Sequence, residues 1–122
     1  MIRGAVNARR EAEIEFRVIG PLGTADVSAV IDTGFTSFLT LPASTAATLG
    51  LVCTSRGTAV IADGSEKEFD VFAAEIEWDG VRRAVLISAL GEDVLVGMGL
   101  LVGHELRMVV EPGGVVEIRR WP

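Results

Sequence analysis

The segment that decides the fold reads Val30-Ile31-Asp32-Thr33-Gly34-Phe35-Thr36-Ser37-Phe38-Leu39-Thr40-Leu41-Pro42. It continues an apolar run that starts at Val27 and is typical of a buried β-strand. That strand ends at Asp32, and Gly34 lets the chain turn tightly there. A second short strand is predicted after the turn and ends at Pro42. The pattern therefore predicts a carboxylate presented on a tight loop between two strands.

The rest of the chain favours a small all-β domain. Its 122 residues fit one domain, residues 1–122, and 49% of them are apolar, which is enough for a buried core. Fourteen Gly, four Pro and many Val, Ile and Thr favour strands joined by tight turns. We therefore expect mainly β-structure with one or two short helices, and no second domain.

Working outward from the loop, alternating and apolar runs predict the remaining elements. Strands are expected at 13–19, 24–31, 38–41, 57–62, 67–78, 82–88, 107–111 and 115–119. Short helices are expected at 43–49, between Pro42 and Gly50, and at 97–103. Hairpin turns are predicted at 20–23, 63–64, 79–80 and 112–114. This order predicts a closed or nearly closed β-barrel.

Charge and hydropathy exclude several classes of function. With 17 acidic and 11 basic residues, the net charge of −6 argues against a nucleic-acid-binding protein, which needs a basic surface. Residues 1–16 are charged and lack the apolar run of a signal peptide. No apolar stretch is long enough for a membrane span. We expect a cytoplasmic protein that binds neither nucleic acid nor a membrane.

The single cysteine and single histidine limit the chemistry further. Because Cys53 is the only cysteine, the chain cannot form an intrachain disulfide. Its apolar neighbours predict a buried, inert thiol. His104 has no Ser or Cys partner in a nucleophile motif, which disfavours a catalytic triad. The shortage of both residue types also disfavours a zinc hydrolase. No metal ion and no organic cofactor are expected.

The chain resembles the retropepsin-like (clan AA) aspartic proteases, which are related to the retroviral proteases. The resemblance is strongest to a prokaryotic branch in which the motif continues as Asp-Thr-Gly-Phe, as it does at 32–35. Residues 94–101, Val-Leu-Val-Gly-Met-Gly-Leu-Leu, are similar to the segment and helix that follow the flap in this family. Ala62-Asp63-Gly64-Ser65 lies where the family places the tip of its flap hairpin. The similarity runs from about residue 14 to about residue 116.

This resemblance implies a retropepsin-like closed barrel with a flap hairpin, and it assigns roles to residues. Asp32 would be catalytic. The active-site loop would comprise Thr33, Gly34, Phe35 and Thr36. The flap that covers the substrate would have Ala62, Asp63, Gly64 and Ser65 at its tip. Gly97, Met98 and Leu100 would support the loop from behind.

The family's reaction needs two carboxylates, and this chain has one Asp-Thr-Gly motif. Two carboxylates held close together cannot both ionise easily, so they share one proton across a water molecule. The resemblance therefore implies a homodimer, with Asp32 of each subunit facing the other and a peptide or protein substrate between them. It also implies that the ends of the chain, 1–8 and 115–122, interleave into a sheet between subunits.

Other interpretations remain open for these residues. Asp32 could be an ordinary turn residue that binds nearby backbone amides, and Asp63-Gly64 could be a simple hairpin turn. Core packing is the default for Phe35 and Phe38, with a wall of the substrate cleft as the alternative. Trp78 and Trp121, the two tryptophans, are expected in the core or an interface. At the level of function, the alternative is a dimeric peptide-binding or assembly module with little or no peptidase activity.

Overall fold

The computed structural model describes all residues, 1–122, and consists mainly of β-strands. Strands account for 56% of the residues and helices for 9%. The ten strands are β1 (Ile2–Val6), β2 (Ala12–Gly20), β3 (Gly23–Ile31), β4 (Leu39–Thr40), β5 (Val52–Val60), β6 (Glu66–Trp78), β7 (Val81–Ser88), β8 (Leu95–Val96), β9 (His104–Met108) and β10 (Val115–Arg120). The two helices are α1 (Ala43–Leu49) and α2 (Met98–Leu101). The all-β prediction is confirmed.

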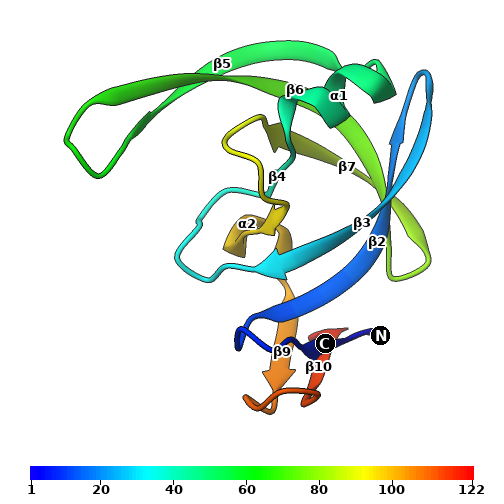
Figure 1. Cartoon of the computed structure of the whole chain (residues 1–122). Helices are drawn as coiled ribbons and strands as arrows, with labels where there is room; N and C mark the ends of the chain where they lie inside the picture. Colours follow the sequence, from blue (N-terminus) through cyan, green and yellow to red (C-terminus); the bar gives the residue numbers. More distant parts are fainter.

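Six of the strands close into a barrel (Figure 1). Their order is β6-β7-β4-β8-β3-β2, and β2 pairs again with β6 to complete the circle. The closing contact is antiparallel and includes Val18 opposite Ile76. Two of the strands, β4 and β8, contribute only two residues each. The loop that carries Asp32 connects the long strand β3 to the short strand β4. It therefore leaves the barrel wall at the place where the long strands are followed by the short ones.

The barrel interior is filled by alternate side chains of the long strands. In β2, Ile14, Phe16 and Val18 are buried, which is the alternation that the sequence predicts. The core cluster contains 21 buried apolar side chains, of which Trp78 is the largest. The Trp78 ring packs edge-on against Phe16, with ring centroids 5.8 Å apart. A single continuous core holds the barrel together.

Helix α1 covers one end of the barrel and has the bounds that the sequence predicts. It starts after Pro42 and ends at Gly50, whose φ of 65° is a left-handed C-cap conformation suited to glycine. The Gly50 N–H donates to the Ala47 carbonyl at 3.0 Å. Leu49 and Ala46 face the core. Neither helix of this structure has the length and hydrophobicity needed to cross a membrane.

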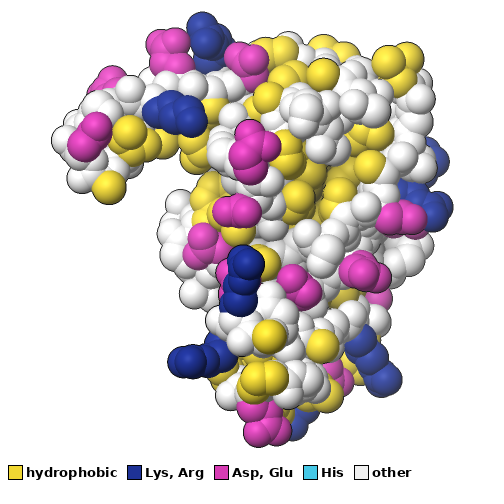
Figure 2. Space-filling model, viewed as in Figure 1, with side chains coloured by type: hydrophobic (Ala, Val, Ile, Leu, Met, Phe, Trp, Pro, Cys, Tyr) yellow, Lys and Arg dark blue, Asp and Glu magenta, His cyan; other side chains and the backbone are white.

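Strands β5 and β6 form a hairpin that extends well beyond the barrel (Figure 1). In the space-filling view this hairpin overhangs an open hollow at the side of the molecule (Figure 2). β5 pairs only with β6, so it is one end of the sheet. The strand predicted at 57–62 starts earlier than expected, at Val52, because its pairing with β6 continues past a bulge between Cys53 and Ser55.

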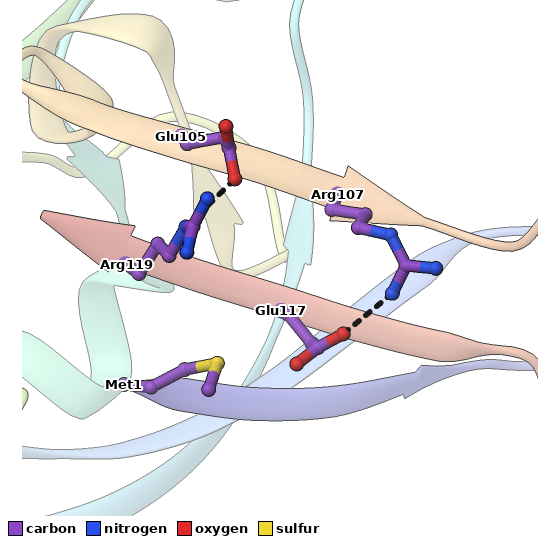
Figure 3. Close-up of a pocket in the computed structure, with 5 residues that line it drawn as sticks. All are labelled: Met1, Glu105, Arg107, Glu117 and Arg119. Carbon is purple, nitrogen blue, oxygen red and sulfur yellow. Dashed lines mark hydrogen bonds and ion pairs between the residues drawn. The ribbon is translucent and has the colours of Figure 1, made fainter. Parts of the chain in front are cut away.

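At the opposite end of the sheet, the two ends of the chain form a small antiparallel extension (Figure 3). β1 lies between β2 and β10, and β10 lies between β1 and β9. Ion pairs join β9 to β10: Arg107 to Glu117 at 2.7 Å, and Arg119 to Glu105 at 2.8 Å. The sequence-based prediction that residues 1–8 and 115–122 interleave with a partner differs from this arrangement. They pair with each other, and both edges of β10 are used within one chain.

Several other predictions need correction. Cys53 is exposed and not buried, because β5 is an end strand whose surface no further strand covers. Trp78 is buried in the core, and Trp121 is 62% exposed in the single chain, so for Trp121 the interface interpretation stays a prediction. The last hairpin starts at His104 instead of residue 107, and α2 is shorter than the predicted 97–103.

Candidate active site

Asp32 stands at the start of the loop that follows β3. Its backbone N–H donates to the Val96 carbonyl at 2.9 Å, which extends the parallel pairing of β3 with β8 by one bond. Its Oδ1 accepts a hydrogen bond from the Gly34 N–H at 3.0 Å, and its carbonyl accepts one from the Phe35 N–H at 3.1 Å. The side chain is half-buried. Local hydrogen bonds therefore fix the orientation of this carboxylate.

The segment around α2 holds the loop from behind through backbone hydrogen bonds. The Met98 N–H donates to the Phe35 carbonyl at 2.8 Å, and the Gly97 N–H donates to the Phe38 carbonyl at 2.9 Å. A third bond runs from the Gly99 N–H to the Ser37 carbonyl at 3.0 Å. Three consecutive donors thus meet three carbonyls of one loop, which restricts its backbone.

Gly97 is a point of very close approach between the two segments. A Cβ atom there would lie 2.2 Å from the Ser37 carbonyl oxygen and 2.6 Å from Cδ2 of Phe35. The Phe35 ring therefore packs against Gly97, in the segment that supports the loop. This agrees with the interpretation of Phe35 as a packing residue. Leu100 is fully buried below it, and its carbonyl accepts a hydrogen bond from Arg83 at 2.9 Å.

Thr40 is a buried polar residue whose contribution the sequence did not reveal. Its hydroxyl donates to the Asp93 carbonyl at 2.8 Å and accepts from the Leu95 N–H at 2.9 Å. These two hydrogen bonds connect β4, the strand that follows the loop, to the start of β8. No local signal marks this role, because the partners lie 53 and 55 residues along the chain.

The outer side of the loop is exposed. Thr33, Gly34 and Thr36 are exposed. A Cβ at Gly34 would meet only Asp32 Oδ1, at 3.3 Å, so nothing else in this chain crowds that position. The loop therefore presents its carboxylate, a hydroxyl and an uncovered backbone on one surface.

The predicted flap tip forms a well-defined turn at the end of the β5–β6 hairpin. Gly64 has a φ of 84°, and its N–H donates to the Ile61 carbonyl at 2.9 Å. Asp63 Oδ1 accepts hydrogen bonds from both the hydroxyl (2.6 Å) and the N–H (2.8 Å) of Ser65. These two bonds, the hydroxyl first, lower the pKa of the Asp63 carboxyl below its usual range.

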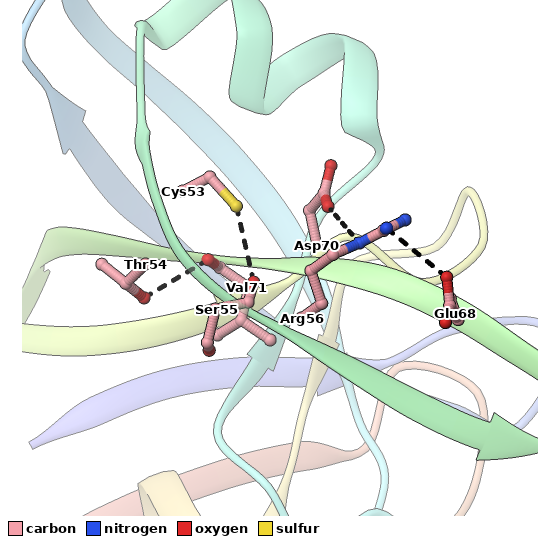
Figure 4. A network of polar contacts seen from close by, with 7 residues as sticks. All are labelled: Cys53, Thr54, Ser55, Arg56, Glu68, Asp70 and Val71. Carbon is pink, nitrogen blue, oxygen red and sulfur yellow. Dashed lines mark hydrogen bonds and ion pairs between the residues drawn. The ribbon is translucent and has the colours of Figure 1, made fainter.

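Polar contacts between the strands stabilise the hairpin, and exposed apolar side chains lie next to the turn at its tip. Arg56 on β5 forms ion pairs with Asp70 at 3.3 Å and Glu68 at 3.4 Å, both on β6 (Figure 4). Beyond them, Val60 is 72% exposed and Ile61 is 44% exposed. Ala62 is exposed as well. Exposed apolar side chains at the end of a braced hairpin are suited to contact with another chain.

The structure thus brings together some of the predicted site residues. The Asp32 loop and the segment 97–100 are in direct contact, whereas the flap tip stands apart on the overhanging hairpin (Figures 1 and 2). The overhang and the loop lie on the same side of the molecule (Figure 1). The catalytic, substrate-binding and supporting roles of these residues remain predictions.

Comparison with known proteins supplies one informative result. No family model matches the sequence, and no curated protein matches it. Among solved structures, the chain is similar to a retropepsin-like aspartic protease from Rickettsia conorii, with a TM-score of 0.55 and 12% sequence identity. The similarity covers 98% of this chain and 91% of the Rickettsia chain. The chain has a retropepsin-like fold.

The match extends over nearly the whole chain. Coverage of nearly the whole chain means that the barrel and both ends are included in the match. At 12% identity the likeness shows the fold alone.

Proposed function

We propose that this protein is an aspartic endopeptidase that works as a homodimer and belongs to the prokaryotic Asp-Thr-Gly-Phe branch of the retropepsin-like proteases. The observation that carries the proposal is the geometry of the Asp32 loop. Its carboxylate accepts a hydrogen bond from the Gly34 N–H at the end of β3, its outer side is exposed, and its backbone carbonyls accept hydrogen bonds from the α2 segment on the other side. One such loop occurs per chain, so a second chain must supply the second carboxylate.

In the proposed reaction, the two Asp32 side chains share one proton and hold a water molecule between them. The ionised carboxylate removes a proton from this water, and the protonated one donates a hydrogen bond to the carbonyl oxygen of the peptide bond. The water oxygen adds to the carbonyl carbon. The amide nitrogen then receives a proton and the C–N bond breaks, without a covalent intermediate. No metal ion or organic cofactor is needed.

The substrate in this proposal is an extended peptide or protein segment that lies between the Asp32 loops and the two hairpins. An extended peptide can pair with strand edges through its backbone, while apolar pockets select its side chains. The exposed Val60 and Ile61 at the hairpin tip offer such apolar surface. Residues 62–65 would close over the substrate as a flap.

The first test is Asp32→Asn, which is nearly isosteric and removes the ability to ionise. We expect loss of cleavage of an unfolded casein-type substrate at mildly acid pH, with the dimer retained in sedimentation experiments. Asp26→Asn is the matched control, because Asp26 is an exposed carboxylate on β3 outside the loop, paired only with Arg17. Cleavage that persists in Asp32→Asn would rule out the assigned role.

A second test addresses the shared site. When wild-type protein is mixed with increasing amounts of the Asp32→Asn variant, subunit exchange should progressively suppress cleavage, because mixed dimers carry only one intact carboxylate. The Asp26→Asn variant should not suppress it. Cleavage that depends only on the amount of wild-type chain would show that each chain works alone.

If neither wild-type protein nor variant cleaves peptides, while both bind them, the alternative of a dimeric peptide-binding or assembly module is favoured. The expectations of a cytoplasmic location and of no binding to nucleic acid stay predictions.

A further inference from the structure

Arg83 is a charged residue on the core face of β7. It lies directly opposite the buried Ile76 of β6, and the next residues on the same face of its own strand, Val85 and Ile87, are buried in the core. Arg83 itself is half-buried at the end of this row. Its Nη1 donates to the Leu100 carbonyl at 2.9 Å, and no carboxylate of the chain forms an ion pair with it. A guanidinium partly removed from water without an opposite charge is unfavourable, so this position is suited to an anion from outside the chain.

Two more arginines line the same hollow as Arg83. This arginine hollow has a volume of about 260 Å³, and Arg82 and Arg120 line it together with Arg83. Arg120 lies opposite His104 in the pairing of β10 with β9, so both side chains are on one face of that sheet. No Asp or Glu lines the hollow, and neither Arg82 nor Arg120 forms an ion pair. In a chain with a net charge of −6, three unpaired arginines around one hollow are a local excess of positive charge.

His104 forms part of the wall of the arginine hollow but offers it no free donor. The Nε1–H of the buried Trp78 donates to Nε2 of His104 at 3.1 Å, and Nδ1 of His104 lies 3.0 Å from the Val102 carbonyl oxygen. With the ring proton on Nδ1, both nitrogens have a partner. The carboxylate of Asp79, at the neighbouring turn, is likewise engaged, since it pairs with the terminal amine of Met1 at 2.6 Å. The guanidinium groups are therefore the free donors of the hollow.

The chemistry of this lining favours a phosphate group. Guanidinium groups bind phosphate oxygens through paired N–H donors, and a phosphate monoester carries a charge of about −1.5 to −2 at neutral pH. A carboxylate carries a single charge and gains less from several arginines. The volume lies below the range of about 300 to 1,000 Å³ that is typical of pockets for drug-sized ligands, which indicates a small molecule. The exposed side chains of Val81 and Val102 also line the hollow and offer apolar contact to the rest of such a molecule.

We propose that the arginine hollow binds the phosphate group of a small molecule, either free phosphate or a phosphate monoester with a short organic part. The β6–β7 turn, whose flanking residues Trp78 and Val81 line the hollow, lies on the opposite side of the molecule from the Asp32 loop (Figure 1). The hollow is therefore separate from the candidate active site, and the proposal goes beyond the proposed function: it holds whether or not the protein cleaves peptides.

Calorimetric titration at neutral pH and constant ionic strength tests the ligand class with three probes. We expect inorganic phosphate and phenyl phosphate to bind, and benzoate, which has the same ring as phenyl phosphate but a single charge, to bind about tenfold more weakly than phenyl phosphate. Tighter binding of phenyl phosphate than of inorganic phosphate would assign the site to a phosphate monoester, and equal binding would assign it to free phosphate. Benzoate that binds as tightly as phenyl phosphate would overturn the proposal, as would the absence of phosphate binding.

Single substitutions test the residues of the site. Arg83→Gln removes the half-buried charge and should weaken phosphate binding about tenfold. Arg120→Gln, at the exposed end of β10, should also weaken it, and it leaves the core face of β7 intact if thermal unfolding shows that Arg83→Gln is unstable. Arg3→Gln is the matched control, because Arg3 is exposed on β1, forms no ion pair and does not line the hollow. It changes the net charge by the same amount. Phosphate binding that is equal in all three variants would overturn the proposal.

Nuclear magnetic resonance of the arginine side chains provides a second, local measurement on wild-type protein. The Nε–H signals of Arg83 and Arg120 should shift as phosphate is added, because the anion accepts hydrogen bonds from these guanidinium groups. The Nε–H signal of Arg56, which is already paired with Asp70 on the β5–β6 hairpin, should stay in place and serves as the internal control. Shifts of equal size at all three arginines would indicate general attraction of the anion to positive charge and would contradict the proposal.

Discussion

At the scale of single residues, the candidate site depends on a glycine that leaves no room for a side chain. The distance from a Cβ at Gly97 to the Ser37 oxygen would be 2.2 Å, which no real Cβ contact tolerates. The nearest atoms belong to the backbone of the Asp32 loop and to the Phe35 ring, and neither can move without displacing the loop. Gly97 thus sets how closely α2 and the loop approach each other.

Gly97→Ala should therefore lower the free energy of unfolding by about 2 kcal/mol or more, as overpacking of a rigid site does. Urea unfolding followed by tryptophan fluorescence measures this change. Gly34→Ala is the matched control in the same loop region, because its Cβ would meet only Asp32 Oδ1 at 3.3 Å. Equal destabilisation by the two variants would contradict the assignment of Gly97 as the point of close approach.

The residues of the loop were predictable from the sequence. The tertiary contacts that hold the loop in place were not. Asp32, Gly34 and the strand before them form a local pattern within a few residues. Thr40 has the pattern of an ordinary strand residue, and its hydrogen bonds to Asp93 and Leu95 depend on the folding of the barrel. The position of the Phe35 ring against Gly97 is likewise a product of tertiary structure.

At the scale of elements, the turn of the β5–β6 hairpin is stabilised by a charged acceptor. Asp63 is exposed, yet its pKa is lowered because the ionised carboxylate accepts two hydrogen bonds from Ser65. A lowered pKa in the folded state means that the carboxylate stabilises the turn fully above its unfolded pKa. That stabilisation is lost as the pH falls through the lower, folded pKa.

We expect the turn to loosen only in strongly acid solution, below the mildly acid range in which the proposed chemistry is tested. Ser65→Ala removes the hydroxyl bond and keeps the N–H bond, so it should raise the pKa of Asp63 part of the way to its usual value. Carboxyl chemical shifts between about pH 2 and pH 6 measure both proteins. An unchanged pKa in the variant would show that the hydroxyl is not the main cause.

Element boundaries were predictable where local signals are strong. Pro42 and Gly50 delimit α1 correctly, and alternating residues reveal β2. β1 is not predicted as a strand of the sheet because its five residues give little alternation, and its partner β10 is more than a hundred residues away. The prediction for Cys53 is wrong because apolar neighbours do not show that β5 is an end strand.

At the scale of the whole molecule, the barrel is closed by a short contact between long strands. Only three residue pairs join β2 to β6, with Val18 and Ile76 at the centre, and both side chains are completely buried. The sequence predicts the strands and most of their turns, but not this pairing. The two segments are far apart in the sequence, so nothing local encodes their contact.

Ile76→Ala should lower the free energy of unfolding by about 2 to 5 kcal/mol, because it leaves a cavity at the closing contact. Glu75→Ala is the matched control one residue away on the exposed face, and it should change stability by no more than about 0.5 kcal/mol. Chemical unfolding curves of both variants test the difference. Similar small decreases in the free energy of unfolding for both variants would mean that the barrel stays stable when the contact between β2 and β6 is weakened.

The pairing of β1 with β10 has a consequence for the order of folding and assembly. Because each end of the chain finds its strand partner within the same molecule, the sheet can be completed before any collision with a second molecule. The rate of barrel formation during refolding should then be independent of protein concentration. Any step that speeds up with concentration should come later and should leave the tryptophan signal of Trp78 unchanged.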